Sequence, residues 1–358
     1  MAKHAVIFAY PREFPADSVE AQVPDPGTAR ALVLARRPDV LALLAHRRKR
    51  LPAGVALPPS ETVERAEDAI LMAFCRLALR HGTWGADYHA YHNEGHILEI
   101  LGPRLDRMID TIGADALSLR DWFLLSLFGA AHDLRQREAP DFAAGIGSNE
   151  RASVEETFRI LRACGFTPER NSELFVGCEL MISGSTFDAR PSEATLEYNP
   201  AELVVQSGGA LAQKLEVKLD KHASGWRSDE RVQHAQRLAL IAADLDTANV
   251  AEPFALFMAS AERLCLEREM RSGRDPVSVA AAQPMLTFLT EGQERYFFEL
   301  HRFSSDYGRH IFQDAKQANA EKLTALTRQL RERLANPSEP LDGATVLAAF
   351  RSLSGAFA

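Results

Sequence analysis

Along most of the chain, apolar residues recur at the spacing of amphipathic helices. Ser60 is followed by glutamates and offers N-cap chemistry, and Val63, Ile70 and Phe74 then fall on one face of a helix. The alternation typical of a strand is confined to Ala5–Tyr10. Because the helical period dominates, the sequence predicts an all-α fold built as a multi-helix bundle.

The same spacing predicts a series of further helices. They are expected at about residues 92–112, 119–134, 149–164, 169–183, 200–219, 229–248, 252–270, 277–312, 314–335 and 341–353. Two long loops, 136–148 and 185–199, interrupt the part of the chain that carries the candidate chemistry. Loops of this length often carry binding residues, so we expect them to decide substrate specificity, although they contain no recognisable code.

Three parts are expected along the chain. Prolines punctuate both ends of residues 1–60, which predicts an irregular N-terminal appendage with one or two short helices. Residues 61–270 are expected to form the helical core, and residues 271–358 to add helices packed on that core. A homodimer built through these C-terminal helices is the alternative.

The composition and the net charge limit the classes of molecule that the protein is expected to bind. Apolar residues make up 46% of the chain and charged residues 25%, which is ordinary for a globular protein. The net charge of -8 disfavours a broad surface for a nucleic-acid polymer, and the basic residues 47–50 are interpreted as a solvated helix end. A small phosphorylated ligand remains compatible, because a bound metal ion reverses the local field.

The number and spacing of the cysteines, and the hydropathy of the chain, bear on the cellular compartment of the protein. The four cysteines are scattered without a Cys-x-x-Cys pair, which predicts reduced and mostly buried thiols. No apolar stretch reaches the roughly 20 residues of a membrane span, and the apolar run near the N-terminus is too short for a signal peptide. We therefore expect a cytoplasmic protein without membrane contact.

The first candidate residues for catalysis or metal binding are histidines. His92 and His96 stand four residues apart, so on a helix both imidazoles project from one face. His132 and Asp133 follow a helix that is apolar nearly all round. Burying this pair costs several kcal/mol unless a cation, a hydrogen bond or a neighbouring helix end compensates the charge, and the sequence leaves these alternatives open.

A third apolar helix ends with carboxylates. Asp244 lies near its C-terminal end, where the helix dipole disfavours an anion, so this side chain needs a positive partner. Asp246, two residues later, is expected to face elsewhere. Two imidazoles and two carboxylates together suit zinc, iron or manganese, with magnesium or manganese at an adjoining oxygen-rich position.

The order His…His-Asp…Asp resembles the HD superfamily of metal-dependent phosphohydrolases. The segment 91–96, YHNEGH, is similar to the Tyr-His-Asn-x-x-His signature of class I cyclic nucleotide phosphodiesterases and of related bacterial HD hydrolases. The bacterial group also tends to carry a later Asn-Glu-x-x-Ser, which matches Asn149, Glu150 and Ser153. The resemblance covers about residues 85–270 and implies an HD-domain-like helical bundle with extra N- and C-terminal segments.

The resemblance also implies roles for individual residues. The expected ligands of a divalent metal are His96, His132, Asp133 and Asp244, and the family equivalent of Asp133 can bridge to a second ion. His92 is implied to donate a proton to the leaving oxygen while water activated by the metal attacks phosphorus. The expected activity is metal-dependent hydrolysis of a small, nucleotide-like phosphomonoester or phosphodiester.

One departure from the phosphodiesterases stands out. Their His-Asp pair is soon followed by another histidine, whereas residues 134–137 here read LRQR, which puts a second metal and a cyclic nucleotide in doubt. Gln283 loosely matches the glutamine that holds the purine in those enzymes. Arg135 is either a contact to substrate phosphate or a solvated loop charge. Glu150 either orients a ligand histidine or simply sits in the first turn of its helix.

Two other functions use related sites. A di-iron oxygenase on an HD scaffold usually needs further histidines before the last aspartate, and only His222 and His234 lie in that interval. A non-catalytic sensor with a metal or nucleotide pocket would be favoured by loss of a ligand, yet every implied ligand and the proton donor are present. Hydrolysis is therefore the leading hypothesis.

Overall fold

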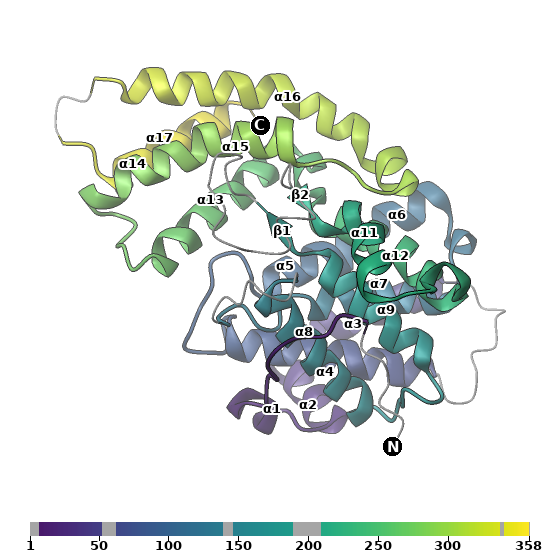
Figure 1. The fold of residues 1–358 in the computed structure, drawn as a ribbon. Helices are drawn as coiled ribbons and strands as arrows, with labels where there is room; N and C mark the ends of the chain where they lie inside the picture. Colours follow the sequence, from purple (N-terminus) through teal and green to yellow (C-terminus); the bar gives the residue numbers. More distant parts are fainter. Residues whose placement is uncertain (1–6, 52–61, 139–145, 189–208, 337–339, 358) are drawn as a thin grey trace. The chain divides into compact units, whose positions relative to one another are not determined.

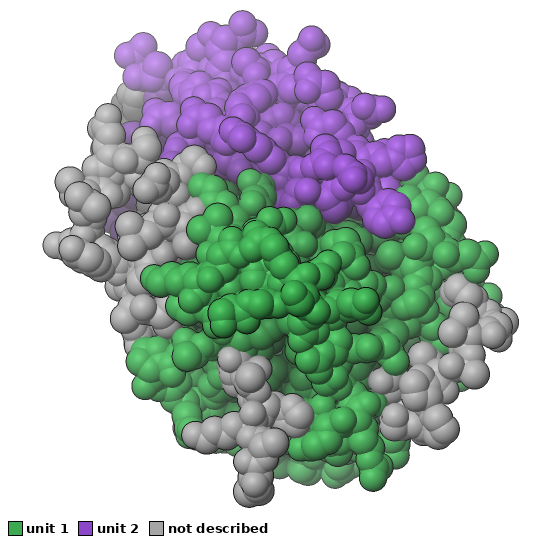
Figure 2. Space-filling view, turned by 45° about the vertical axis from the view of Figure 1, so that its right-hand side comes forward, with its two compact units in different colours: residues 1–88, 92–246 green, residues 89–91, 247–358 purple. Residues whose placement is uncertain are grey.

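The computed structural model describes residues 7–51, 62–138, 146–188, 209–336 and 340–357, and in these ranges the regular structure is almost entirely helical (Figure 1). The described strands are β1 (Phe187–Asp188) and β2 (Gly209–Ala210), which pair antiparallel with Phe187 opposite Ala210. The all-α prediction is confirmed. The chain divides into two compact units, residues 1–88 with 92–246 and residues 89–91 with 247–358, coloured separately in Figure 2.

The N-terminal part of unit 1 is helical rather than irregular. It contains α1 (Ser18–Gln22), α2 (Pro26–Arg36) and α3 (Pro38–Arg50). Pro26, one of the prolines that suggested an irregular segment, stands at the first position of α2, and Pro38 stands at the first position of α3, where a missing N–H costs nothing. Asp17 and Asp25 cap α1 and α2 through their side chains. The expected strand at 5–10 is absent from its described residues, 7–10.

The core of unit 1 is built from α4 (Val63–Arg80), α7 (Leu119–Ala131), α8 (Ser148–Ala163), α9 (Ser172–Gly184) and α12 (Glu230–Asp246). The most extensive packing joins α9 to α12, while α7 packs against α4 and α9 and α2 packs along α4. Because α7 is covered on several sides, apolar residues from Trp122 to Ala131 are buried all round it. These helices begin and end within a few residues of the predicted positions.

The predicted helix at 92–112 is divided. It comprises α5 (Glu94–Glu99), a π-helical turn η1 (Ile100–Arg104) and α6 (Leu105–Ile112). Pro103 lies inside the π-helical turn, where the altered hydrogen bonding accommodates its missing N–H. The short helix η2 (Ala114–Ala116) follows.

The region between α9 and α12 differs from the prediction. Residues 200–208 of the predicted helix 200–219, and most of the predicted loop 185–199, lie outside the described residues. After β2 the chain forms η3 (Leu211–Lys214), α11 (Leu215–His222) and η4 (Trp226–Ser228).

Unit 2, residues 89–91 with 247–358, is also helical. It holds η5 (Ala248–Ala251), α13 (Phe254–Arg271), α14 (Val279–Thr287), η6 (Phe288–Gly292), α15 (Gln293–Arg295), η7 (Tyr296–Leu300), α16 (Asp306–Leu334) and α17 (Gly343–Ala356). The predicted helix 277–312 breaks after Leu300, and Ser305 caps α16 by accepting from the Gly308 N–H. Asn319 ties α16 to η5 by donating to the Val250 carbonyl at 2.9 Å.

Two sequence predictions concern the whole chain. The four cysteines are buried and form no disulfide, and burial raises the pKa of each thiol to about 12. Among the helices in the described ranges, none combines the length and the apolar character needed to cross a membrane.

Candidate metal centre

Three residues predicted as metal ligands meet inside unit 1. His96 comes from α5, and His132 and Asp133 follow directly after α7. One ligand atom from each of the three lies within 4.8 Å of the others, and all three side chains are buried. The Asp133 Oδ2 atom is 3.0 Å from His132 Nε2 and 3.8 Å from His96 Nε2. The convergence on which the metal prediction depends is therefore present for these three.

The end of α7 determines how His132 is presented. His132 is the C-cap residue, and its ring stacks on Phe128 one turn earlier at 4.8 Å between centroids. Its Nδ1 lies 3.1 Å from the Phe128 carbonyl oxygen, which can only accept, so Nδ1 carries the proton. A neutral His132 then presents the lone pair of Nε2 to the rest of the site, as metal-binding histidines do.

Two buried polar atoms at the site make no hydrogen bond. These are His132 Nε2 and Asp133 Oδ2, which face each other at 3.0 Å. A lone pair against a carboxylate oxygen is repulsive unless a proton or a metal ion lies between them. Burial alone would lower the pKa of His132, but the carboxylates of Asp133 and Asp246 raise it well above the ordinary imidazole value. A proton on the imidazole or a bound metal ion relieves this repulsion, and the cluster could hold a metal ion.

The carboxylate that α12 brings to these imidazoles is Asp246. Its Oδ1 lies 3.0 Å from His96 Nε2 and 3.2 Å from His132 Nε2. The expectation that Asp246 faces elsewhere is wrong. Neither Asp246 nor the buried Asp244 is among the three residues whose ligand atoms all lie within 4.8 Å of one another, and the role of Asp244 as a ligand stays a prediction.

The geometry of α12 explains why the sequence did not distinguish the two aspartates. They are two residues apart, which on a helix turns their side chains by about 200°. A helix buried nearly all round provides no apolar stripe from which to tell the inward direction. The available signal was that Asp246, the last residue of the helix, is a second carboxylate at the unfavourable end of the helix dipole.

The resulting donor set fits a divalent cation. Two imidazole nitrogens and two carboxylate oxygens come from α5, the end of α7 and the end of α12. The nearby histidines, led by His132, outweigh burial and lower the pKa of Asp133 and of Asp246, so both carboxylates are ionised. His96, His132 and Asp133 could hold a metal ion, and the Asp246 carboxylate lies beside the two imidazoles.

His92 stands beside this group without joining it. The helix α5 begins at Glu94 with Asn93 as its N-cap, so His92 lies in the preceding turn and not on the helix as predicted. Its ring is half-buried and meets the His96 ring edge-on at 6.3 Å between centroids. Its position next to the ligands, but outside them, is compatible with the predicted division of roles.

The match to Asn-Glu-x-x-Ser lies on α8 and supports the segment after Asp133. The Asn149 Oδ1 accepts the Glu138 N–H at 3.0 Å, and the Ser153 hydroxyl accepts the Arg135 N–H at 3.1 Å. Both residues therefore hold the backbone that continues from Asp133. Burial, and secondarily the Asp133 charge, raises the pKa of Glu150 to about 7.

Arg135 and Gln283, which were predicted as possible substrate contacts, have other partners in the structure. Arg135 is surrounded by carboxylates, with Glu138 at 2.5 Å, Glu156 at 3.6 Å and Glu20 at 3.7 Å from its guanidinium. These partners occupy the guanidinium that was expected to meet either phosphate or solvent. Gln283 belongs to unit 2, where it is exposed on α14 and donates to the Thr287 hydroxyl at 3.3 Å.

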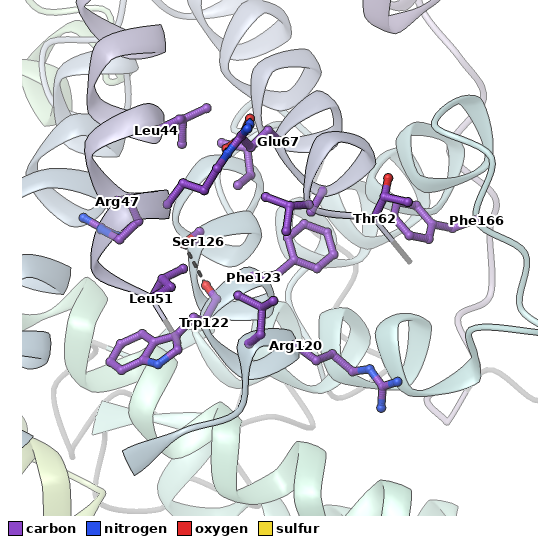
Figure 3. Close-up of a pocket in the computed structure, with 15 residues that line it drawn as sticks. Leu44, Arg47, Leu51, Thr62, Glu67, Arg120, Trp122, Phe123, Ser126 and Phe166 are labelled. Carbon is purple, nitrogen blue, oxygen red and sulfur yellow. Dashed lines mark hydrogen bonds and ion pairs between the residues drawn. The ribbon is translucent and has the colours of Figure 1, made fainter. Parts of the chain in front are cut away.

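A pocket elsewhere in unit 1 is lined by other kinds of side chain than the candidate metal centre (Figure 3). It has an empty volume of about 560 Å³ and is lined by α3, α4 and the first part of α7, with Trp122, Phe123 and Phe166 among its apolar side chains. Its polar groups already have partners, since Ser126 donates to the Trp122 carbonyl and Arg48 pairs with Glu67. Arg47, predicted to be solvated, is buried and pairs with Asp106. The lining contains no histidine and does not compete as a metal site.

The fold and the site define an all-helical protein with a buried histidine–aspartate group able to hold a metal ion. No family model matches the sequence, and the comparison with curated proteins finds no significant match.

Proposed function

We propose that the protein is a metal-dependent phosphohydrolase that acts on a small, nucleotide-like phosphomonoester or phosphodiester. The proposal depends on one observation above all: His132 Nε2 and Asp133 Oδ2 face each other in the buried interior without a hydrogen bond, 3.0 Å apart. His96 and Asp246 complete a four-residue donor set around this pair. Such an arrangement is costly unless a cation shares it.

The chain's residues divide into ligands and a proton donor. When bound, a divalent cation stabilises charge on a phosphoryl group and acidifies water. The Phe128 carbonyl keeps His132 in the tautomer that can bind a cation through Nε2. His92, half-buried beside His96, is placed to hold a proton for the leaving oxygen.

The surroundings favour a small substrate. The net charge of -8 offers little attraction to a long polyanion, so the cation site would supply most of the local positive charge. The carboxylates around Arg135 leave that residue a poor candidate for phosphate binding. Because LRQR replaces the segment that carries a further histidine in the phosphodiesterases, a cyclic nucleotide is not the favoured substrate.

The two histidines that lie between His132 and the end of α12 favour hydrolysis over oxygen activation. A di-iron oxygenase would need them as extra ligands. His234 instead pairs with Asp121 at 2.6 Å, and His222 lies against Phe8 at 6.0 Å between ring centroids. A site with only the four ligands suits one cation, with a second ion bridged by Asp133 as the alternative.

Two measurements test the proposal. Metal analysis of the purified protein identifies the resident ion, and chelated protein is then reloaded with manganese, zinc, iron or magnesium. Turnover is assayed on p-nitrophenyl phosphate, bis-p-nitrophenyl phosphate and cyclic nucleotides. We expect metal-dependent hydrolysis of at least one ester, lost in His132→Ala. Fully loaded protein that hydrolyses none of them, or that consumes oxygen with paired iron, contradicts the proposal.

A further inference from the structure

The side chain of Gln136 connects the metal-site aspartate to α8. We infer that Gln136 is a positioning residue that fixes the carboxylate of Asp133 so that one defined oxygen faces the cation. The inference rests on the proposed metal centre, and turnover is not needed to judge it. Neither the His-Asp motif nor the Asn-Glu-x-x-Ser match includes this glutamine.

The direction of the hydrogen bonds follows from the chemistry of the partners. An ionised carboxylate only accepts, so the amide NH₂ of Gln136 must be the group that donates to Asp133 Oδ1. The Gln136 Oε1 then accepts from Asn149 Nδ2 at 3.2 Å, and Asn149 Oδ1 accepts from the Glu138 N–H at 3.0 Å. We call the three side chains of Asp133, Gln136 and Asn149 the amide relay. Only one assignment of donors and acceptors along the amide relay is consistent with all of these hydrogen bonds.

The backbone that carries Gln136 is held at consecutive residues. Its N–H donates to His81 Nε2 at 3.2 Å, and the neighbouring Arg135 N–H donates to Ser153 Oγ at 3.1 Å. The Leu134 carbonyl accepts from Arg80 at 2.6 Å. Gln136 is also buried, with 7% of its surface exposed, and turning its side chain away from Asp133 would break its hydrogen bond with Asn149 as well.

The relay decides which oxygen of Asp133 is available to a cation. With Oδ1 accepting from Gln136, Oδ2 is the atom that faces His132 Nε2 at 3.0 Å and His96 Nε2 at 3.8 Å. A neutral amide restrains the carboxylate without neutralising it, whereas an arginine or lysine would compete with the metal for its charge. Residues that orient metal ligands in this way typically change metal affinity 10- to 100-fold when they are replaced.

Two substitutions separate positioning from bulk packing. Gln136→Met keeps an unbranched side chain of similar length and removes the amide. Gln136→Glu keeps the shape but places a second acceptor against Asp133. The matched control is Gln236→Met, another buried glutamine of unit 1, which lies near the middle of α12. Affinity for Mn²⁺ is measured by electron paramagnetic resonance, and the ligand field is read from the visible absorption of the Co²⁺-loaded protein.

We expect Gln136→Met to weaken Mn²⁺ binding about 10- to 100-fold and to alter the Co²⁺ spectrum. Gln136→Glu should weaken binding at least as much, and Gln236→Met should leave both readouts at the wild-type values. The thermal midpoint in the presence of a chelator reports any general loss of packing. Weakened binding in Gln136→Met with a midpoint close to that of Gln236→Met supports the inference.

Two results overturn it. If the wild-type protein binds Mn²⁺ and Gln136→Met binds it equally well with an unchanged Co²⁺ spectrum, the relay has no positioning role. If the wild-type protein binds neither ion, the metal centre itself is wrong and the relay falls with it. Protein that binds metal but hydrolyses no ester contradicts only the proposed function, because affinity and spectrum still decide the role of Gln136.

Discussion

The Nδ1–H of His132 donates to the carbonyl oxygen of Phe128, 3.1 Å away and one turn earlier in α7. This bond leaves Nε2 directed at the carboxylates of Asp133 and Asp246. The end of α7 thus presents a buried imidazole in a defined orientation to a group of side chains that could hold a metal ion. The first two predictions below test this arrangement.

Asp246→Asn and Asp244→Asn form a matched pair on one helix. Asp246 contacts both imidazoles, so its variant is expected to lose about 10-fold or more in affinity for Mn²⁺ or Zn²⁺, because an amide is a weaker ligand than a carboxylate. With Asp246 proposed as the α12 ligand, Asp244→Asn is expected to lose less affinity. Affinity is measured by competition with a chelator. The reverse order of effects would assign the α12 ligand to Asp244, as the family resemblance implies.

His92→Ala is expected to keep the metal and lose turnover. His92 lies outside the ligand group, so metal content after gel filtration should equal that of the wild type. Loss of a general acid typically reduces kcat by about 10²- to 10⁴-fold. Esters with a p-nitrophenolate leaving group need little protonation and should suffer less than alkyl esters. Metal-free His92→Ala protein would show that the assigned role is wrong.

Glu179 makes the stability of unit 1 depend on pH. Burial raises the pKa of this carboxyl to about 7, while it accepts the Phe8 N–H at 2.9 Å. Between the unfolded pKa of about 4.3 and the folded value, the folded state binds more protons, so the free energy of unfolding falls as pH rises. Glu179→Gln keeps an acceptor for Phe8 and removes this titration.

Relative to the wild type, Glu179→Gln should gain up to about 3 kcal/mol of unfolding free energy between pH 4.5 and pH 7.5. Urea unfolding at several pH values measures the difference. The exposed Glu332→Gln serves as the control and should show no such trend. A pH-independent difference for Glu179→Gln would mean that the carboxyl is ionised in the folded protein throughout this range.

Two glycines of α17 provide opposite packing tests in unit 2. A Cβ at Gly343 would lie 1.9 Å from the Pro276 carbonyl oxygen, a backbone atom that cannot easily move, whereas a Cβ at Gly355 meets nothing within 4 Å. Gly343→Ala should therefore destabilise the protein by about 1–3 kcal/mol. Gly355→Ala should stabilise it by up to about 1 kcal/mol through helix propensity. Thermal unfolding of both variants checks the pair, and equal effects would contradict the packing at Gly343.

The sequence predicted the helices because their signals are local. A period of 3.6 residues, together with caps such as Thr62 before α4, is contained within a few turns of chain. The same locality explains the errors. Pro26 was taken as part of an irregular segment, although it stands at a helix start, and the non-helical residues 301–305 were missed inside an otherwise helical pattern.

By itself, the sequence determined the helical fold class and identified His96, His132 and Asp133 as candidate ligands, because the order of the motifs and the ends of the helices can be recognised from neighbouring residues. Only the tertiary structure decided that Asp246 meets the two imidazoles and that Gln136 holds Asp133. The physical reason is that the direction of a side chain on a fully buried helix depends on how that helix is rotated against its neighbours. That rotation is set by packing of α12 against α9 and α7, helices that are distant from it in the sequence.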